Sequence, residues 1–288
     1  MKEWFTEPWQ FEFMQRALYA GLLVSITGGV VGTFVVVKGL AFLSDAVAHT
    51  SLTGAAVAFV LGGGTLAISI GAAIAGVLTA VCVAALTRLV RLREDTAIGL
   101  LFAGIFGLGI LIISSADNYA LELNSFIVGN ILGVSQQDLV LMAILTAIVL
   151  VAVLVFYDEL LFTAYDEEMA AASGVPVTLA WMGLLALVAL TAVIAFRLVG
   201  VVLVMAMLVA PAAAASLIFR RMHWIMLGAA VLGALSTVAG LYLSFHADLA
   251  AGPSIVTAAI ALFGVSFLAS PNGLPSKLRA GRWTAKTG

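Results

Sequence analysis

Charged residues are scarce in this sequence of 288 residues. Only 10% of the residues are charged, and 63% are hydrophobic, whereas a soluble domain averages about 25% charged and about 45–50% apolar residues. This balance excludes a water-soluble protein and predicts an all-α, polytopic membrane protein. The net charge of −2 is also too small to indicate nucleic-acid binding, so no nucleic-acid partner is expected.

Cysteine and the common catalytic motifs are also missing. The single Cys82 lies in an apolar run, which excludes a disulfide framework and a cysteine metal cluster. The sequence has neither H-E-x-x-H nor G-x-S-x-G, so we expect no enzymatic activity in this chain. It also lacks G-x-x-x-x-G-K-[ST], so any ATP hydrolysis coupled to it would take place in a separate partner chain. No permanently bound cofactor is expected.

Long apolar runs predict about nine membrane-spanning helices (eight or nine), because about 20 apolar residues cross the hydrocarbon core. A lead-in over 1–16 carries tryptophan and phenylalanine suited to a membrane interface. A single transmembrane domain follows over 17–270, and 271–288 form a polar tail. The predicted spans lie near 17–37, 46–62, 65–87, 97–114, 138–156, 177–196, 198–219, 225–245 and 254–270.

Lysine and arginine give the orientation of these spans, because cytoplasmic loops carry an excess of both. With nine spans, most of the basic residues fall on one side: Lys38, Arg88, Arg91, Arg93, Arg220, Arg221, Lys277, Arg279, Arg282 and Lys286. Only Lys2, Arg16 and Arg197 fall on the other side. The C-terminus is therefore predicted to be cytoplasmic and the N-terminus external. The loop over 115–137 then lies outside, and its apolar centre, 125–134, is too short to cross the membrane.

An aspartate and a histidine stand out in the stretch "FLSDAVAHTSLTG". Asp45 and His49 are four residues apart, so on a helix over 44–62, capped by Ser44 after a break at Lys38-Gly39, they project from one face. A carboxylate oxygen and an imidazole nitrogen make half of a site for a first-row divalent metal. The alternative is that Asp45 caps the helix at the membrane surface and that His49 extends toward the interface.

The longest polar insert, 158–176, contains five acids and no lysine or arginine. Asp166 precedes a short helical pattern over 167–173, which Gly174 and Pro176 end. The insert is either a solvated loop or a short surface helix offered to a soluble partner with a basic cleft.

Three further features have a structural and a functional interpretation. Pro211 lies within an apolar span, where it favours helix packing or a gating hinge. Lys38 is an anchor at the inner surface or a gate. His246 and Asp248, in the loop "SFHADLAAGPS", are simply solvated or attract cations on the outside.

Five segments in the same order resemble the membrane subunit of an ATP-binding-cassette importer of the manganese/zinc/iron type, and the resemblance covers about 15–270. They are "GLAFLSDAVAHTSLTGAAVAFVLG" (39–62), "SFIVGNILGVSQQDL" (125–139), "AYDEEMAAASGVPV" (164–177), "LVGVVLVMAMLVAPAAAASLI" (198–218) and "AGLYLSFHADLAAGPSIV" (239–256).

This resemblance implies a type II importer-like permease in a bacterial inner membrane, formed as a homodimer with its pore on the two-fold axis. It implies two cytoplasmic ATP-binding subunits and an extracytoplasmic metal-binding protein as partners. By position, Asp45 and His49 match the cation-contacting pair of the family. The segment at about 164–175 matches its coupling helix, which carries Asp166, Glu167, Glu168, Met169 and Gly174.

Two other functions compete with a metal-importing permease. A proton-coupled secondary transporter would use Asp45 and His49 as a relay, and an importer of siderophore-like or cobalamin-like cargo would have a related topology. The ligand types do not choose among manganese, zinc and iron, because mixed oxygen and nitrogen ligation suits all three.

Overall fold

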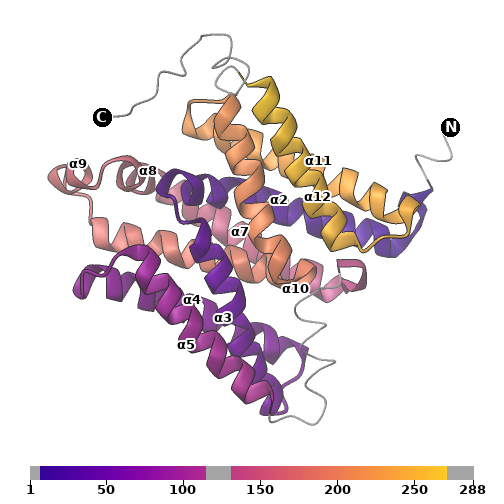
Figure 1. Cartoon of the computed structure of the whole chain (residues 1–288), viewed down its shortest axis with the longest axis horizontal. Coiled ribbons are helices and arrows are strands. Elements are labelled where there is room, and N and C mark those ends of the chain that lie inside the picture. The colour runs from indigo at the N-terminus through magenta and orange to yellow at the C-terminus, as the bar shows by residue number, and fades with distance from the viewer. Residues whose placement is uncertain (1–6, 115–130, 271–288) are drawn as a thin grey trace, which may run out of the picture.

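A computed structural model of the chain describes residues 7–114 and 131–270, and these residues form a bundle of helices (Figure 1). The expected all-α architecture is confirmed. The elements in chain order are η1 (Pro8–Gln10), α2 (Glu12–Lys38), α3 (Ala41–Val60), α4 (Thr65–Leu89), α5 (Glu94–Ile113), η2 (Ile131–Gly133), α7 (Gln136–Val155), α8 (Tyr157–Tyr165), α9 (Glu167–Ala172), α10 (Val177–Ile218), α11 (Met222–Ala247) and α12 (Ala251–Ala269).

Eight stretches of the described residues are helical, long and apolar enough to cross a membrane. One prediction differs from the structure: the two spans predicted at 177–196 and 198–219 form a single helix, α10, of 42 residues. Its second part, Val204–Ile218, is shorter than a usual span. Figure 1 shows the two parts of α10, salmon and orange, running in different directions. The backbone of α10 is helical at Arg197, where we predicted a boundary between two spans.

Small residues bring the helices together. Gly32 of α2 lies directly against the backbone of Leu208 in α10, and Gly29 lies against the backbone of Ala230 in α11. Gly54 of α3 faces α4 in the same way. Without a hydrophobic driving force between helices in lipid, such close approach supplies the packing energy. Ala212 and Ala215 of α10 likewise lie in one buried cluster with Ile225 and Ala229 of α11.

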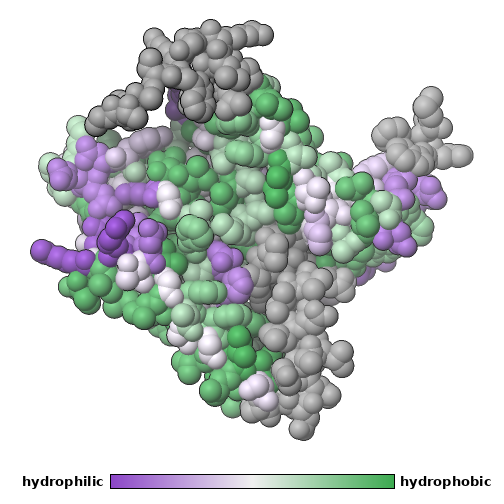
Figure 2. Space-filling view, in the orientation of Figure 1, coloured by the Kyte–Doolittle hydropathy of each residue, from purple (hydrophilic) through white to green (hydrophobic). Residues whose placement is uncertain are grey.

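The molecule has two polar ends separated by hydrophobic surface (Figure 2). One polar end carries α8 and α9, and the other surrounds the start of α2 (Figures 1 and 2). Since α2 has 27 residues, its rise of about 1.5 Å per residue makes it about 40 Å long, enough to connect these two ends. The chain is therefore built as a multi-pass membrane protein.

The predicted break at Lys38-Gly39 is confirmed, but the predicted cap is wrong. Gly39 ends α2 in the left-handed conformation, with φ 72°, which glycine adopts at little cost. Helix α3 then begins at Ala41, earlier than expected, and Leu40 is its N-cap. Ser44 lies inside the helix, where its hydroxyl donates to the carbonyl oxygen of Ala41 at 2.7 Å.

Replacing Gly32 with alanine is expected to destabilise the bundle. The new Cβ would overlap the carbonyl oxygen of Leu208, and such overpacking costs about 1–3 kcal/mol. The measurement is the thermal midpoint of the purified protein in detergent. Gly183→Ala is the matched control, because a Cβ at Gly183 meets nothing within 4 Å. Equal midpoints for the two variants would contradict the tight α2–α10 contact.

Candidate functional site

Asp45 and His49 lie on consecutive turns of α3. The Nδ1 atom of His49 is 3.5 Å from Oδ1 of Asp45 and 2.9 Å from the backbone oxygen of the same residue. A carbonyl oxygen can only accept a hydrogen bond, so this contact requires the proton on Nδ1. The lone pair of a neutral imidazole is then on Nε2, the atom that would bind a metal. Both side chains are partly exposed, His49 by 26% and Asp45 by 34%.

Two phenylalanines of α5 hold the imidazole ring. The ring centroids of Phe102 and Phe106 lie 5.2 and 5.1 Å from that of His49, and both rings are nearly perpendicular to it. The two phenylalanines are themselves stacked at an interplanar angle of 11°. Helix α5 is further attached to α3 by Thr53, whose hydroxyl donates to the carbonyl oxygen of Ile105 at 2.7 Å. The position of His49 thus depends on α5.

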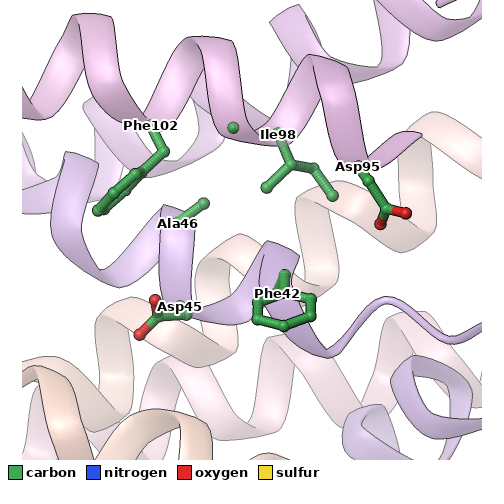
Figure 3. Close-up of a pocket in the computed structure, with 7 residues that line it drawn as sticks. Phe42, Asp45, Ala46, Asp95, Ile98 and Phe102 are labelled. Carbon is green, nitrogen blue, oxygen red and sulfur yellow. The ribbon is translucent and has the colours of Figure 1, made fainter. Parts of the chain in front are cut away.

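A pocket of about 270 Å³ adjoins this pair between α3 and α5 (Figure 3). Most of its lining is apolar, and its two carboxylates are Asp45 and Asp95. Figure 3 shows Asp45 and Asp95 on different ribbons, with Ile98 and Phe42 between them. The two carboxylates point to opposite sides in this view, so each marks a different edge of a largely apolar pocket.

One chain supplies only part of a metal site. Within residues 7–114 and 131–270, no group of three or more histidine, cysteine, aspartate and glutamate side chains is arranged to hold a metal ion. Asp45 and His49 offer one oxygen and one nitrogen ligand, and a tetrahedral or octahedral ion needs more. Among the described residues, this pair alone therefore does not complete a tight metal site.

The acidic insert forms two short helices, and its sequence signals are confirmed. Asp166 is the N-cap of α9, and its carboxylate accepts a hydrogen bond from the backbone N–H of Met169 at 2.9 Å. The chain leaves the helix at Gly174 with φ 83°. Glu168 and Met169 are exposed, whereas Ala170 is fully buried. The helix therefore presents one face to solvent and buries the other.

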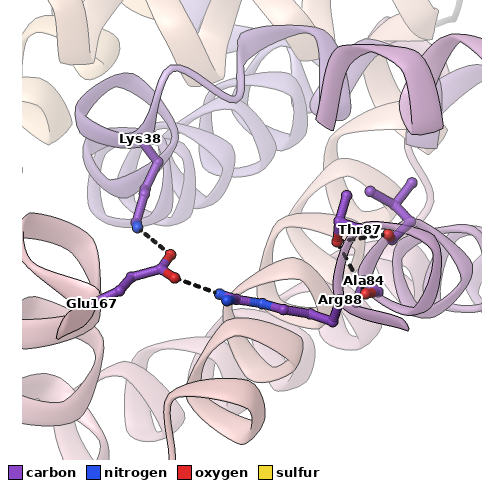
Figure 4. A network of polar contacts seen from close by, with 6 residues as sticks. Lys38, Ala84, Thr87, Arg88 and Glu167 are labelled. Carbon is purple, nitrogen blue, oxygen red and sulfur yellow. Dashed lines mark hydrogen bonds and ion pairs between the residues drawn. The ribbon is translucent and has the colours of Figure 1, made fainter. Parts of the chain in front are cut away.

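Glu167 of α9 is less exposed than Glu168. One of its carboxylate oxygens accepts a hydrogen bond from Nζ of Lys38 at 2.8 Å, and the other accepts one from Nη2 of Arg88, also at 2.8 Å (Figure 4). Both cations lie over the ring of Trp181, at 5.2 and 5.4 Å from its centroid. We call these four residues the Glu167 cluster.

The charges around Glu167 set its protonation. Partial burial raises the pKa of the Glu167 carboxyl, but the hydrogen bonds from Lys38 and Arg88 outweigh that effect, so its pKa lies below the ordinary value. The carboxyl is thus ionised at neutral pH and binds both cations as an anion.

The remaining candidates lie apart from Asp45 and His49. Pro211 is buried inside α10. The ring of His246 stacks on Tyr242 with centroids 5.0 Å apart, and its Nδ1 lies 3.0 Å from the carbonyl oxygen of Tyr242. Asp248 is exposed and ends α11 with φ 52°. The apolar centre of the predicted external loop, 125–134, lies mostly outside the described residues, and 1–6 and 271–288 lie wholly outside them.

Several residues at the site were not singled out in the sequence. Phe102 and Phe106 have the same i, i+4 spacing as Asp45 and His49, and this spacing is the one sequence signal that could have identified them. Arg88 was counted only as an inside charge, and Trp181 only as part of an apolar run. Their roles depend on contacts between helices far apart in the sequence.

Comparison with known proteins then identifies the family. Residues 10–270 match the ABC 3 transport family. The chain belongs to this family. It is 38% identical to the manganese transport system membrane protein MntC of Halalkalibacterium halodurans, over 93% of this chain and 90% of that protein. It is 34% identical to a probable iron transport system membrane protein of Haemophilus influenzae, over 92% and 97% of the two chains.

The family is also evident in three dimensions. The fold matches a chain of the structure of PsaBC from Streptococcus pneumoniae in complex with Fab, with a TM-score of 0.85 and 34% identity. The match covers 97% of this chain and 100% of that one. The resemblance to a membrane subunit of an ABC importer, stated above from five segments, is confirmed.

The Glu167 cluster is expected to make stability depend on pH. Because the pKa of Glu167 is lowered on folding from the ordinary value of 4.5, its contribution is present above pH 4.5 and is lost as the pH falls through the lower folded value. The thermal midpoint of the wild type should therefore drop more between pH 5 and pH 3 than that of Glu167→Gln. Parallel curves for the two proteins would contradict this assignment.

Proposed function

We propose that this chain is the membrane permease of an ATP-driven importer of divalent metal ions, with manganese as the first cargo to test. The observation that carries the proposal is the Asp45–His49 pair, which places a carboxylate and an imidazole on one helix of a chain from a transport family. Charged groups at membrane depth cost about 2.5–3.5 kcal/mol on insertion scales, so they are usually kept for a function.

The cargo is inferred from the relatives and from the ligand types. Relatives from Halalkalibacterium, Listeria and Streptococcus are named as manganese transport or import proteins, and one from Haemophilus is named as a probable iron transport protein. Carboxylate suits manganese, and imidazole suits iron and zinc as well. We therefore rank manganese first and iron second.

The partial ligand set supports a homodimer with a shared site. Two copies would bring two carboxylates and two imidazoles to one axis, enough for four ligands. Such a site must bind the ion tightly enough to replace water and weakly enough to release it. The dimer, the shared site and its position on the axis are all part of the proposal.

The proposal also includes partners and an orientation. Cytoplasmic ATP-binding subunits would dock on the exposed face of α9, where Glu168 and Met169 lie, and an extracytoplasmic metal-binding protein would deliver the ion. The C-terminus would be cytoplasmic and the N-terminus external, in a bacterial inner membrane. The positive-inside rule supports this orientation, because Lys38 and Arg88 lie beside α9.

The test is uptake of labelled manganese, iron and zinc by vesicles that contain this chain with its ATP-binding and metal-binding partners. ATP-dependent uptake is expected for the wild type. His49→Ala and Asp45→Ala should each lower the uptake rate by at least about 10–100-fold, because the loss of even an outer-shell partner of a metal ligand costs that much. Both variants should still assemble into the complex.

His223→Ala and Asp158→Asn are the matched controls, because each removes the same side-chain type at an exposed position. Normal uptake by His49→Ala and Asp45→Ala would place the metal path elsewhere. Uptake that persists without ATP and stops on adding a proton uncoupler would favour the secondary transporter. Assembly without any metal uptake would favour a chelated or organic cargo.

A further inference from the structure

Glu167 differs from its neighbours on α9 because it faces the membrane domain. Its two carboxylate oxygens are each bound by a cation from a different spanning helix, Lys38 from α2 and Arg88 from α4. These cations are 129 and 79 residues away in the sequence. One side chain on the outer helix is therefore attached to the ends of two separate spans (Figure 4).

Trp181 closes the other side of this cluster. It belongs to α10 and is 1% exposed, so its indole is fixed by the surrounding packing. Lys38 and Arg88 each lie between this ring and the Glu167 carboxylate. The side chain of Lys38 is only 15% exposed. Four helices, α2, α4, α9 and α10, are thus joined through polar and cation–π contacts at one point.

The cluster is directly connected to the candidate metal pair. Lys38 is the last residue of α2, and Gly39 and Leu40 form the turn into α3, which begins at Ala41. Asp45 lies four residues further, about 6 Å along the helix axis. Only the two residues of this turn therefore separate Lys38 from the helix that carries Asp45 and His49.

The elbow between α2 and α3 also has room to move. Phe42 and Asp45, in the first turns of α3, line the pocket of about 270 Å³ between α3 and α5. Gly39 has open space around the position of a Cβ. The end of α2 is thus attached to α9 through Lys38, and the start of α3, three residues later, faces unfilled volume.

We infer that Glu167 is a positioning residue that links α9 to the α2–α3 elbow, so that movement of α9 changes the direction in which Asp45 and His49 point. The inference rests on the proposed function, since it is the ATP-binding partners that would move α9. It gives Lys38 the role of transmitting that movement. Glu168 and Met169, on the exposed face of α9, would contact the partner instead.

The test measures coupling, because a merely structural defect would lower the amount of complex and leave its stoichiometry unchanged. Full complexes in vesicles are assayed for manganese uptake and ATP hydrolysis together. Glu167→Gln and Lys38→Met should each lower the number of ions moved per ATP by about fivefold or more, within the usual range of coupling between sites. The manganese concentration for half-maximal uptake should stay unchanged, because Asp45 and His49 remain.

Matched variants separate the cluster from other effects. Asp158→Asn removes an exposed acid from the same insert, and Arg91→Met removes an exposed inside cation, and both should keep the wild-type ratio. Lys38→Arg keeps the positive charge and should restore most of the coupling. The double variant Lys38→Met with Glu167→Gln should be no worse than Glu167→Gln alone, because Glu167→Gln already removes the ion pair with Lys38.

Wild-type ratios in both Glu167→Gln and Lys38→Met, alongside uptake that still requires His49, would overturn this inference and keep the proposed function. A loss in Glu167→Gln alone, with Lys38→Met normal, would also overturn it, because Glu167 would then act only on the partner. If Lys38→Met does not assemble, Lys38→Gln and Arg88→Gln are used in its place, because both keep a polar side chain. Both variants must then lower the number of ions moved per ATP. Absence of ATP-dependent uptake in the wild type would overturn the proposed function and this inference with it.

Discussion

Every polar group in a bundle that crosses lipid must find its partner inside the protein, and this constraint organises the whole chain. The backbone meets it by forming helices. Many hydroxyls meet it within their own helix: Thr33, Thr79 and Thr191, for example, each donate to the carbonyl oxygen four residues earlier. These side chains need no partner on another helix. The helices can then pack through small residues such as Gly29 and Gly32. Among the described residues, the hydroxyl of Thr146 and the indole N–H of Trp181 are exceptions, because both are buried without a hydrogen-bond partner.

The carboxylate of Glu167 cannot satisfy itself in this way. It lies at the edge of the membrane domain and requires cations from α2 and α4, which brings those helix ends together beneath α9. Exposed ion pairs contribute only about 0.2–1 kcal/mol each, and these pairs are partly exposed. Their importance is therefore geometric: they determine where α9 lies relative to the α2–α3 elbow. The stability of the bundle comes mainly from close helix packing.

Features encoded locally were predicted well from the sequence. The length of the apolar runs gave the spanning helices, Gly39 gave the break after α2, and Asp166 with Gly174 gave the limits of α9. Features that depend on tertiary contacts were not. Ser44 has the residue type of a cap but bonds within a helix that starts three residues earlier. Arg197 indicated a boundary between two spans; the backbone stays helical there, and the two parts of α10 run in different directions.

The two glutamates at the start of α9 show why the candidate site could be predicted only in part. Glu167 and Glu168 are equivalent by composition, charge and position in the motif. Adjacent helical residues point about 100° apart, so Glu167 and Glu168 face different surroundings. Which of them does so depends on where Lys38 and Arg88 end their helices, and that depends on the packing of α2 and α4 against α10. Asp45 and His49 could be paired from their spacing alone, since both belong to one helix. The aromatic rings that hold His49 come from α5, so only the folded chain reveals them.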